Sequence, residues 1–177
     1  MRLNRWVLIA VVFLITMLII FPGAKEKTLT IGDVVPDFRA IDLNGDYFFY
    51  NDYRSNVVLL NFSATWCAYC LEELPYLEKL NKKYRDQGLI IVTVFQDYQN
   101  IDLIKEIIDK NNISYLVVTD EKGKISKLFG VVALPFSVII DRNSVIRYSY
   151  IGFVAQDMER YECTIRNLLR ENAIQRK

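Results

Sequence analysis

Residues 57–75 read VVLLNFSATWCAYCLEELP, and this stretch decides the fold that the sequence predicts. Its first six residues form a short, largely apolar run, which is typical of a β-strand that is buried on both faces. From Cys67 onwards, apolar residues recur at spacings of three and four, which predicts a helix that is stopped by Gly88. Cys67 and Cys70 are therefore expected where a central strand turns into a helix.

The predicted helix has an apolar side and a charged side. Its apolar side carries Cys70, Leu74, Leu77 and Tyr84, and the pattern assigns to the solvent side Glu78, Lys79, Lys82 and Lys83. Pro75 lies inside this helix and is expected to kink it near Leu71, because proline cannot donate a backbone hydrogen bond.

Strands and helices alternate along the rest of the chain. The predicted strands are 37–41 and 47–50 around Asn44-Gly45, 89–95, 115–120, and two that flank Arg142-Asn143 as a hairpin. The predicted helices are 101–110, a short one near 126–129, and 155–171. The fold class is therefore α/β: a central mixed sheet flanked by helices, with an N-terminal β-hairpin and a helical insertion between strands.

The amino-acid composition and the residues around the cysteines exclude several classes of function. Lys and Arg number 22 against 21 for Asp and Glu, so the chain has no charge excess that would attract nucleic acid. It has no histidine, which excludes hydrolases that use a histidine base. Haem attachment is excluded because Leu71 follows Cys70, and a zinc site lacks ligands because Cys163 is the third and last cysteine. The two spaced cysteines are then either a redox pair or two inert thiols, and no metal is expected.

The N-terminal segment predicts a membrane anchor. Arg2 and Arg5 precede an uncharged run, Trp6–Ala24, and about 17–25 such residues span a bilayer. A cleaved signal peptide is the alternative, but Phe21 and Pro22 stand where cleavage needs a small residue. The predicted organisation is a cytoplasmic N-terminus at 1–5, a transmembrane anchor at 6–24, a linker at 25–30, and a domain at 31–177 outside the cytoplasmic membrane.

Three stretches carry a resemblance to a known family: LLNFSATWCAYCLEELPYLEKLNKKY, VVALPFSVIID and VIRYSYIG. They resemble the TlpA/ResA-like family of thioredoxin-fold, membrane-anchored thiol-disulfide oxidoreductases, and the likeness extends over roughly Ile31 to Leu169. The resemblance implies a thioredoxin-like fold and a redox-active Cys67–Cys70 disulfide with no further cofactor. It also implies protein disulfide substrates, with apocytochrome c as the best-known class, and a dithiol donor in the membrane. We expect a monomer.

The position of each cysteine on the helix predicts its role. Cys67, in the first turn, is the expected nucleophile, because unpaired amides and the helix dipole stabilise an accessible thiolate and lower its pKa. Cys70, one turn later, faces the core and is expected to resolve the mixed disulfide.

A carboxyl group accompanies the pair. Glu73 lies three residues after Cys70 and so shares its helical face, whereas Glu72 projects to solvent. In the resembled family a glutamate at this position assists proton transfer, so we expect a dehydrated Glu73 with a raised pKa; an ordinary solvated charge is the alternative. Asn61 occupies the strand position at which thioredoxins proper carry a buried acid, so that proton route is expected to be absent.

Four further residues are predicted to bind substrate. Trp66 is either a core residue or a lid beside the cysteines, and Tyr69 belongs to a partner-docking surface. Leu134-Pro135 matches the cis-proline of the resembled family, which holds the substrate backbone. The chain departs from the family pattern in its Ala68-Tyr69 spacer and in Phe136-Ser137, which leaves the redox potential and the substrate contacts open.

The third cysteine, Cys163, lies in the predicted last helix. Cys163 falls opposite the apolar stripe of the last helix and is expected to be an exposed, incidental thiol, with intermolecular pairing as the alternative.

The favoured function is an extracytoplasmic reductase of disulfides in exported proteins. The alternatives are an oxidant that uses the same pair and a binding module without turnover, for which two intact cysteines would be unnecessary.

Overall fold

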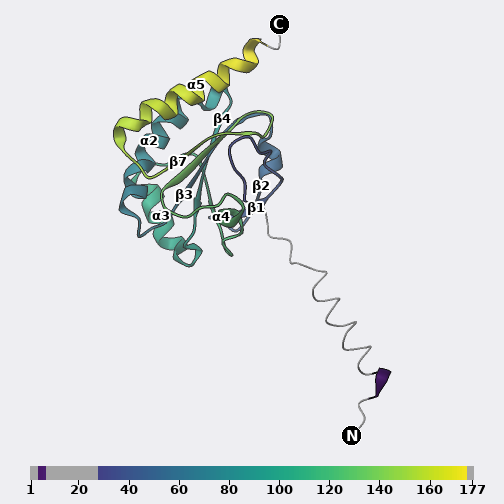
Figure 1. Cartoon of the computed structure of the whole chain (residues 1–177). Helices are drawn as coiled ribbons and strands as arrows, with labels where there is room; N and C mark the ends of the chain where they lie inside the picture. Colours follow the sequence, from purple (N-terminus) through teal and green to yellow (C-terminus); the bar gives the residue numbers. More distant parts are fainter. Residues whose placement is uncertain (1–3, 7–27, 175–177) are drawn as a thin grey trace.

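The computed structural model describes residues 4–6 and 28–174, and the second range folds around one central sheet (Figure 1). Within this range the strands lie in the order β2-β1-β5-β4-β3-β6-β7. Their bounds are β1 Arg39–Asp42, β2 Tyr47–Phe49, β3 Val57–Ser63, β4 Leu89–Phe95, β5 Leu116–Thr119, β6 Phe136–Ile140 and β7 Ile146–Ile151.

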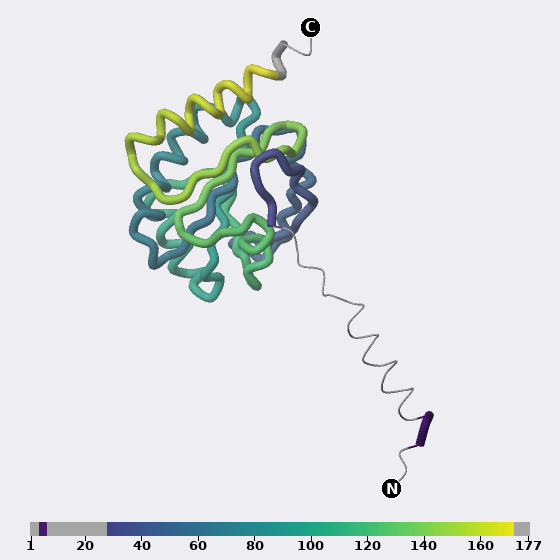
Figure 2. Tube along the Cα trace, in the orientation of Figure 1, coloured from purple at the N-terminus to yellow at the C-terminus, as the bar shows by residue number. Residues whose placement is uncertain are grey.

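Helices cover both faces of the sheet. One face packs against α2 (Ala68–Tyr84), α3 (Ile101–Lys110) and α5 (Met158–Ile174), while the other packs against α4 (Lys124–Leu128) and the segment before β1. Figure 2 shows α5, in yellow, running beside α2, and Glu162 of α5 accepts hydrogen bonds from Lys83 Nζ at 2.5 Å and Tyr84 Oη at 2.7 Å. Short 3₁₀ turns complete the chain: η1 Tyr50–Tyr53, η2 Arg85–Gln87, η3 Tyr98–Asn100 and η4 Ala155–Asp157.

The centre of the sheet is parallel and fully covered. Every residue of β3 is buried, which is why its sequence is a nearly continuous apolar run. β3 pairs in parallel with β4, and β4 with β5, so that Ser63, Phe95 and Thr119 lie level at the carboxyl ends of the three strands. This edge of the sheet carries the turn that leads to Cys67.

The predicted hairpins and the insertion are confirmed. β1 and β2 pair antiparallel around Gly45, whose φ of 93° suits glycine, and β6 and β7 pair antiparallel across the Arg142-Asn143 turn. α3 lies between β4 and β5 with the bounds that its periodicity predicts. The mixed α/β architecture expected from the sequence is therefore present.

Several helix bounds differ from the prediction, among them those of α4 at 124–128 and the C-terminal end of α5 at Ile174. The backbone of Cys67 is extended, at φ −91° and ψ 100°, so α2 begins at Ala68 with Cys67 as its N-cap. The last helix starts three residues later than predicted, because Ala155–Asp157 form a 3₁₀ turn before Met158. α2 itself continues through Pro75 as one helix, which ends at Tyr84 before the η2 turn and Gly88.

The prediction for Glu78 was wrong. The pattern assigned it to the solvent side, yet its side chain is buried and accepts hydrogen bonds from the backbone N of Ser114 at 2.9 Å and from Ser114 Oγ at 2.7 Å. The loop that precedes β5 covers this side of α2 and satisfies the carboxylate, which makes its burial tolerable.

The predicted anchor lies outside the described residues, apart from Trp6, and the predicted linker is described from Thr28 onwards. Among residues 4–6 and 28–174, no helix combines the length and the apolarity needed to cross a bilayer.

Candidate active site

The two cysteines lie at the start of α2 and are joined by a disulfide. Their Cα atoms are 5.2 Å apart. Cys67 Sγ also accepts a hydrogen bond from the backbone N of Cys70 at 3.3 Å, so the sulfur caps the first turn of the helix. The sulfur of Cys67 is thus the atom closest to the unpaired amides at the helix N-terminus.

The turn between β3 and Cys67 is held by an aspartate from the next strand. Thr65 donates its backbone N–H to both carboxylate oxygens of Asp97, at 3.0 and 3.2 Å, and its hydroxyl also donates to Oδ2. Asp97 follows β4 at the same edge of the sheet. Asp97 is not among the predicted site residues, although a polar residue just after a buried strand is a signal in the sequence that could have identified it.

The two cysteines differ in their exposure to solvent. In the disulfide form Cys67 is 8% exposed and Cys70 is 1% exposed, so the two differ in the expected direction but neither is open. Ala64 and the two cysteines form a small apolar cluster, and Leu134 packs against this cluster. The apolar cover explains why the pair is shielded when it is oxidised.

Two aromatic side chains next to the disulfide are open to solvent. Trp66 is 72% exposed and Tyr69 is 64% exposed. The interpretation of Trp66 as a core residue was therefore wrong, while its role as a lid beside the cysteines stays a prediction. Large apolar groups are costly to leave in water and mark surfaces that contact partners when they cluster.

Leu134 and Pro135 directly precede β6. The Leu134–Pro135 peptide bond is cis, as the resemblance implies, and Leu134 packs against the cluster of Ala64, Cys67 and Cys70. The carbonyl of Pro135 accepts a hydrogen bond from the backbone N of Gly152 at 2.8 Å, which ties this loop to the end of β7.

Glu73 is fully buried on the same side of α2 as Cys70, whereas Glu72 is exposed. Burial raises the pKa of Glu73 to about 7, and the Asn61 amide and the Tyr161 hydroxyl oppose part of this rise because they favour the carboxylate. The expectation of a dehydrated carboxyl with a raised pKa is confirmed.

Asn61 is the direct partner of Glu73. Its Nδ2 donates to Glu73 Oε2 at 2.9 Å and to Ser137 Oγ at 3.0 Å, while Thr93 Oγ1 donates to its Oδ1 at 3.3 Å. All four residues are buried. From its sequence position Asn61 is only the residue that replaces a buried acid. In the structure it contacts a different acid, Glu73, twelve residues later, and no local pattern predicts that contact.

Within the described residues, Glu73 Oε1 has no hydrogen-bond partner. Because Asn61 presents N–H groups to Oε2, that oxygen acts as an acceptor in either protonation state, and a proton on neutral Glu73 belongs on Oε1. The carboxyl is thus held at Oε2 by Asn61, and Oε1 is the oxygen that carries the proton of its neutral form.

Cys163 is not part of this site. It is exposed on α5, as expected, and its Sγ is 3.8 Å from Asn167 Nδ2. In residues 4–6 and 28–174 no cluster of three or more histidine, cysteine or acidic side chains could hold a metal ion.

Comparisons with known proteins agree with this site. Residues 31–149 match the model of the AhpC/TSA family. The chain is 31% identical over 157 residues to the thiol-disulfide oxidoreductase ResA of Bacillus cereus, which covers 82% of this chain and 87% of the relative.

Two solved structures are similar in fold. One comes from Chlorobium tepidum and is described provisionally as the thiol:disulfide interchange protein DsbE. Its TM-score is 0.75 and its sequence identity 32%, and the match covers 80% of this chain and 99% of that one. The other is the exposed lipoprotein thioredoxin of Streptococcus pneumoniae strain TIGR4, with a TM-score of 0.64 and 26% identity over 75% of this chain and 100% of that one. The fold is thus thioredoxin-like, and the chain belongs to the AhpC/TSA family, in its ResA/TlpA-like branch, and is a thiol-disulfide oxidoreductase.

Proposed function

We propose that the chain is a reductase anchored in the cytoplasmic membrane, with residues 31–177 on the outer side, and that it reduces disulfides in exported proteins. The observation that carries the chemistry is the disulfide at the start of α2 with buried Glu73 on the same side of that helix. The uncharged run Trp6–Ala24 supports the anchor, and the likeness to an exposed lipoprotein supports the compartment.

The first step is attack on the substrate. In the reduced protein, the thiolate of Cys67 attacks one sulfur of a substrate disulfide, which forms a mixed disulfide and releases the other substrate sulfur as a thiolate. The amides at the start of α2 stabilise the attacking thiolate, because they present unpaired N–H groups and the positive end of the helix dipole.

The second step frees the substrate. Cys70 loses its proton and attacks Cys67 Sγ, so the Cys67–Cys70 disulfide forms and the second substrate thiolate leaves. Two electrons have then passed to the substrate, and a membrane dithiol returns the pair to the reduced state. Glu73 is the group that accepts the Cys70 proton, since a pKa of about 7 lets it take up and release protons near neutral pH.

Exposed apolar side chains around the disulfide form the substrate-docking surface in this proposal. Trp66 and Tyr69 flank the cysteines, and Val132, at 85% exposed, stands three residues before Pro135. An unfolded exported chain offers apolar side chains and free backbone groups to such a surface. Apocytochrome c belongs to this class of substrate, and the protein acts on it as a monomer.

The reduction potential of the Cys67–Cys70 couple tests the direction of electron flow. The couple is equilibrated with thiol buffers and its redox state is read by mass spectrometry after alkylation. A potential near that of thioredoxin, about −270 mV, supports a reductase, whereas one near −120 mV is typical of strong oxidants and contradicts the proposal.

Trapping of mixed disulfides tests the substrate class. Cys70→Ser removes the resolving thiol, so substrates stay joined to Cys67 and are identified in cells by mass spectrometry. Exported cysteine-containing proteins are expected among the adducts, and Cys67→Ser/Cys70→Ser is the matched control. A turnover-free binding module would bring down the same proteins with either variant.

A further inference from the structure

The described chain enters the domain beside α4. The backbone N of Leu29 donates to the carbonyl of Leu128 at 2.8 Å, which ties residue 29 to the end of that helix. Thr28 packs closely on Gly130. A Cβ atom added to Gly130 would lie only 2.2 Å from Thr28 Cγ2. The point at which the domain joins the preceding segment is therefore fixed to the α4 side.

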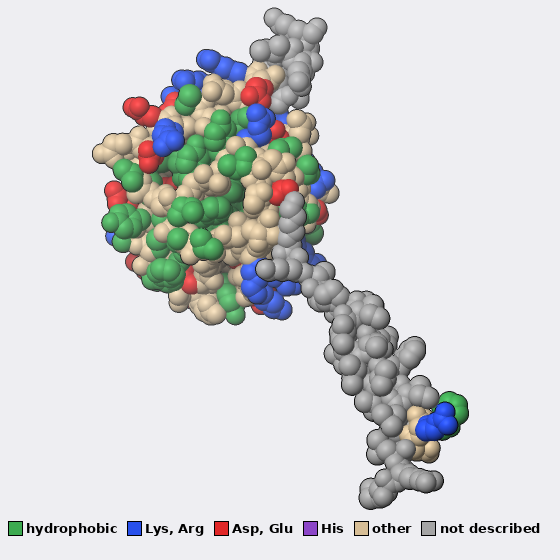
Figure 3. All heavy atoms as spheres, in the orientation of Figure 1, with side chains coloured by type: hydrophobic (Ala, Val, Ile, Leu, Met, Phe, Trp, Pro, Cys, Tyr) green, Lys and Arg blue, Asp and Glu red, His purple; other side chains and the backbone are tan. Residues whose placement is uncertain are grey.

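Four basic residues surround this point of attachment. Arg39, Lys122, Lys124 and Lys127 line one surface hollow together with apolar residues of α4 and of the segment before β1, and we call these four residues the basic surface. Within the described part of the chain, none of them forms an ion pair, although the guanidinium of Arg39 lies 5.6 Å from the centre of the Tyr47 ring. Figure 3 shows blue basic side chains gathered at the lower edge of the domain.

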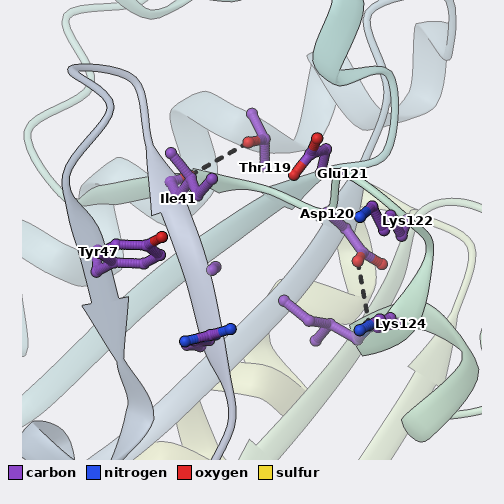
Figure 4. Close-up of a pocket in the computed structure, with 10 residues that line it drawn as sticks. Ile41, Tyr47, Thr119, Asp120, Glu121, Lys122 and Lys124 are labelled. Carbon is purple, nitrogen blue, oxygen red and sulfur yellow. Dashed lines mark hydrogen bonds between the residues drawn. The ribbon is translucent and has the colours of Figure 1, made fainter.

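The acidic residues nearby do not cancel this charge. Figure 4 shows Asp120 and Glu121 beside Lys122 and Lys124 where β5 ends. Asp120 is buried and accepts hydrogen bonds from the backbone N of Ile125 at 3.2 Å and of Ser126 at 2.8 Å, so it serves the start of α4. Glu121 is one exposed carboxylate among four cations, and the surface stays positive.

The length of the tether limits how far this surface can lie from a bilayer. If the anchor proposed above ends at Ala24, four residue steps lead to Thr28, and each spans at most about 3.3–3.6 Å. Thr28 and the adjoining α4 are then held within roughly 14 Å of the membrane surface. Electrostatic attraction reaches about 8 Å at physiological ionic strength, which is of the same order.

We propose that the basic surface docks the domain on the anionic phospholipid headgroups of the membrane in which the chain is anchored. This inference rests on the proposed anchor and deepens it, because the tether supplies proximity and the four cations supply orientation. The docking has a consequence for the redox site. Cys67 follows β3 and α4 follows β5, and the carboxyl ends of these parallel strands are level, so the disulfide lies at the same edge of the sheet as α4, the helix that docking would hold near the bilayer.

Lysine footprinting of the full chain tests the docking. The chain is reconstituted in vesicles of phosphatidylcholine, or of equal parts phosphatidylcholine and phosphatidylglycerol, and a membrane-impermeant reagent acylates its amines. Lys122, Lys124 and Lys127 are expected to react about fivefold more slowly in the anionic vesicles, while Lys79 of α2 and Lys105 of α3 react at equal rates in both. Equal rates for the three basic-surface lysines overturn the docking.

A variant pair and two further readouts separate the possible failures. K122E/K124E, which changes two exposed side chains, is expected to abolish the protection of Lys127, whereas K79E/K105E carries the same change of charge and is expected to preserve it. Flotation of the chain with neutral vesicles after an alkaline wash measures membrane insertion of the anchor alone. A chain that does not float with these vesicles has no anchor, which removes the basis of the docking. Protection by inorganic phosphate in neutral vesicles would show a small-anion site and overturn membrane docking. Insulin reduction in detergent measures the redox function independently of all these results.

Discussion

At the scale of single residues, Glu73 has the surroundings of a group that moves protons. It is buried, its pKa is raised to about 7, and one of its oxygens is fixed by Asn61. We predict that Glu73→Gln keeps the fold and slows disulfide exchange by about 10²–10⁴-fold, the usual value of a positioned proton-transfer group. Stopped-flow reduction of a model disulfide across pH 5–9, a range of about two units on either side of that pKa, checks this.

Glu72 provides the control for that experiment, because it precedes Glu73 on the same helix but is exposed. Glu72→Gln is expected to leave both the rate and its pH profile unchanged. If the two variants behave alike, Glu73 has no part in proton transfer, and the chemistry depends on the cysteines and the helix terminus.

Asn61 should set the pH at which Glu73 works. The amide favours the carboxylate, so removing it in Asn61→Leu is expected to move the pKa of Glu73 upward from about 7. The inflection in the pH–rate profile should shift upward with it, and the shift should vanish in the Glu73→Gln background. Ser137→Ala, which removes a contact of Asn61 but none with Glu73, is the matched control. An unchanged inflection in Asn61→Leu would rule out the coupling.

At the scale of elements, the start of α2 distinguishes the two thiols. Cys67 caps the helix, and Cys70 is one turn inside it with 1% exposure. In the reduced protein Cys67 is therefore expected to be alkylated much faster than Cys70, because it is nearer both to the solvent and to the helix amides. Timed alkylation and peptide mass spectrometry measure the two rates. Equal rates would exclude the assignment of Cys67 as the nucleophile.

The helices and strands also show which features of the structure can be predicted from the sequence. α3 and the central strands could be predicted because their patterns repeat within each segment. Glu78 could not, since the group that satisfies it, Ser114, is 36 residues away. The Asn61–Glu73 contact and the Asp97 support of the turn are likewise made across elements. The sequence identified the cysteines and Glu73, whereas tertiary packing determined their partners and burial.

The Glu78–Ser114 contact has a measurable effect on the packing of α2 beside β5. Ser114→Ala removes the hydroxyl donor to a buried carboxylate and is expected to lower the free energy of unfolding by about 1–2 kcal/mol. Urea titration gives the change. Ser149→Ala, at an exposed position in β7, is the control and should have little effect. A loss as small as that of the control would show that solvent replaces the hydroxyl.

At the scale of the whole molecule, the redox site and the basic surface share one edge of the sheet. The chain as a whole is nearly neutral, with a formal charge of +1, so its orientation on a membrane depends on where the charges lie. The parallel strands β3, β4 and β5 bring the cysteines and the three lysines of the basic surface to that edge, although these residues are more than fifty positions apart in the sequence.

The stability of the whole domain should fall as the pH rises through the range in which Glu73 titrates. Its pKa is 4.5 unfolded and about 7 folded, so between these values the folded protein binds more protons than the unfolded one. The stabilisation is complete below pH 4.5 and is lost as the pH approaches and passes 7. A difference of this size corresponds to about 3 kcal/mol. Urea titrations of the oxidised protein at several pH values are expected to show this decline, and Glu73→Gln should abolish it while Glu72→Gln preserves it. A decline of the same size in Glu73→Gln would assign the pH dependence to other groups.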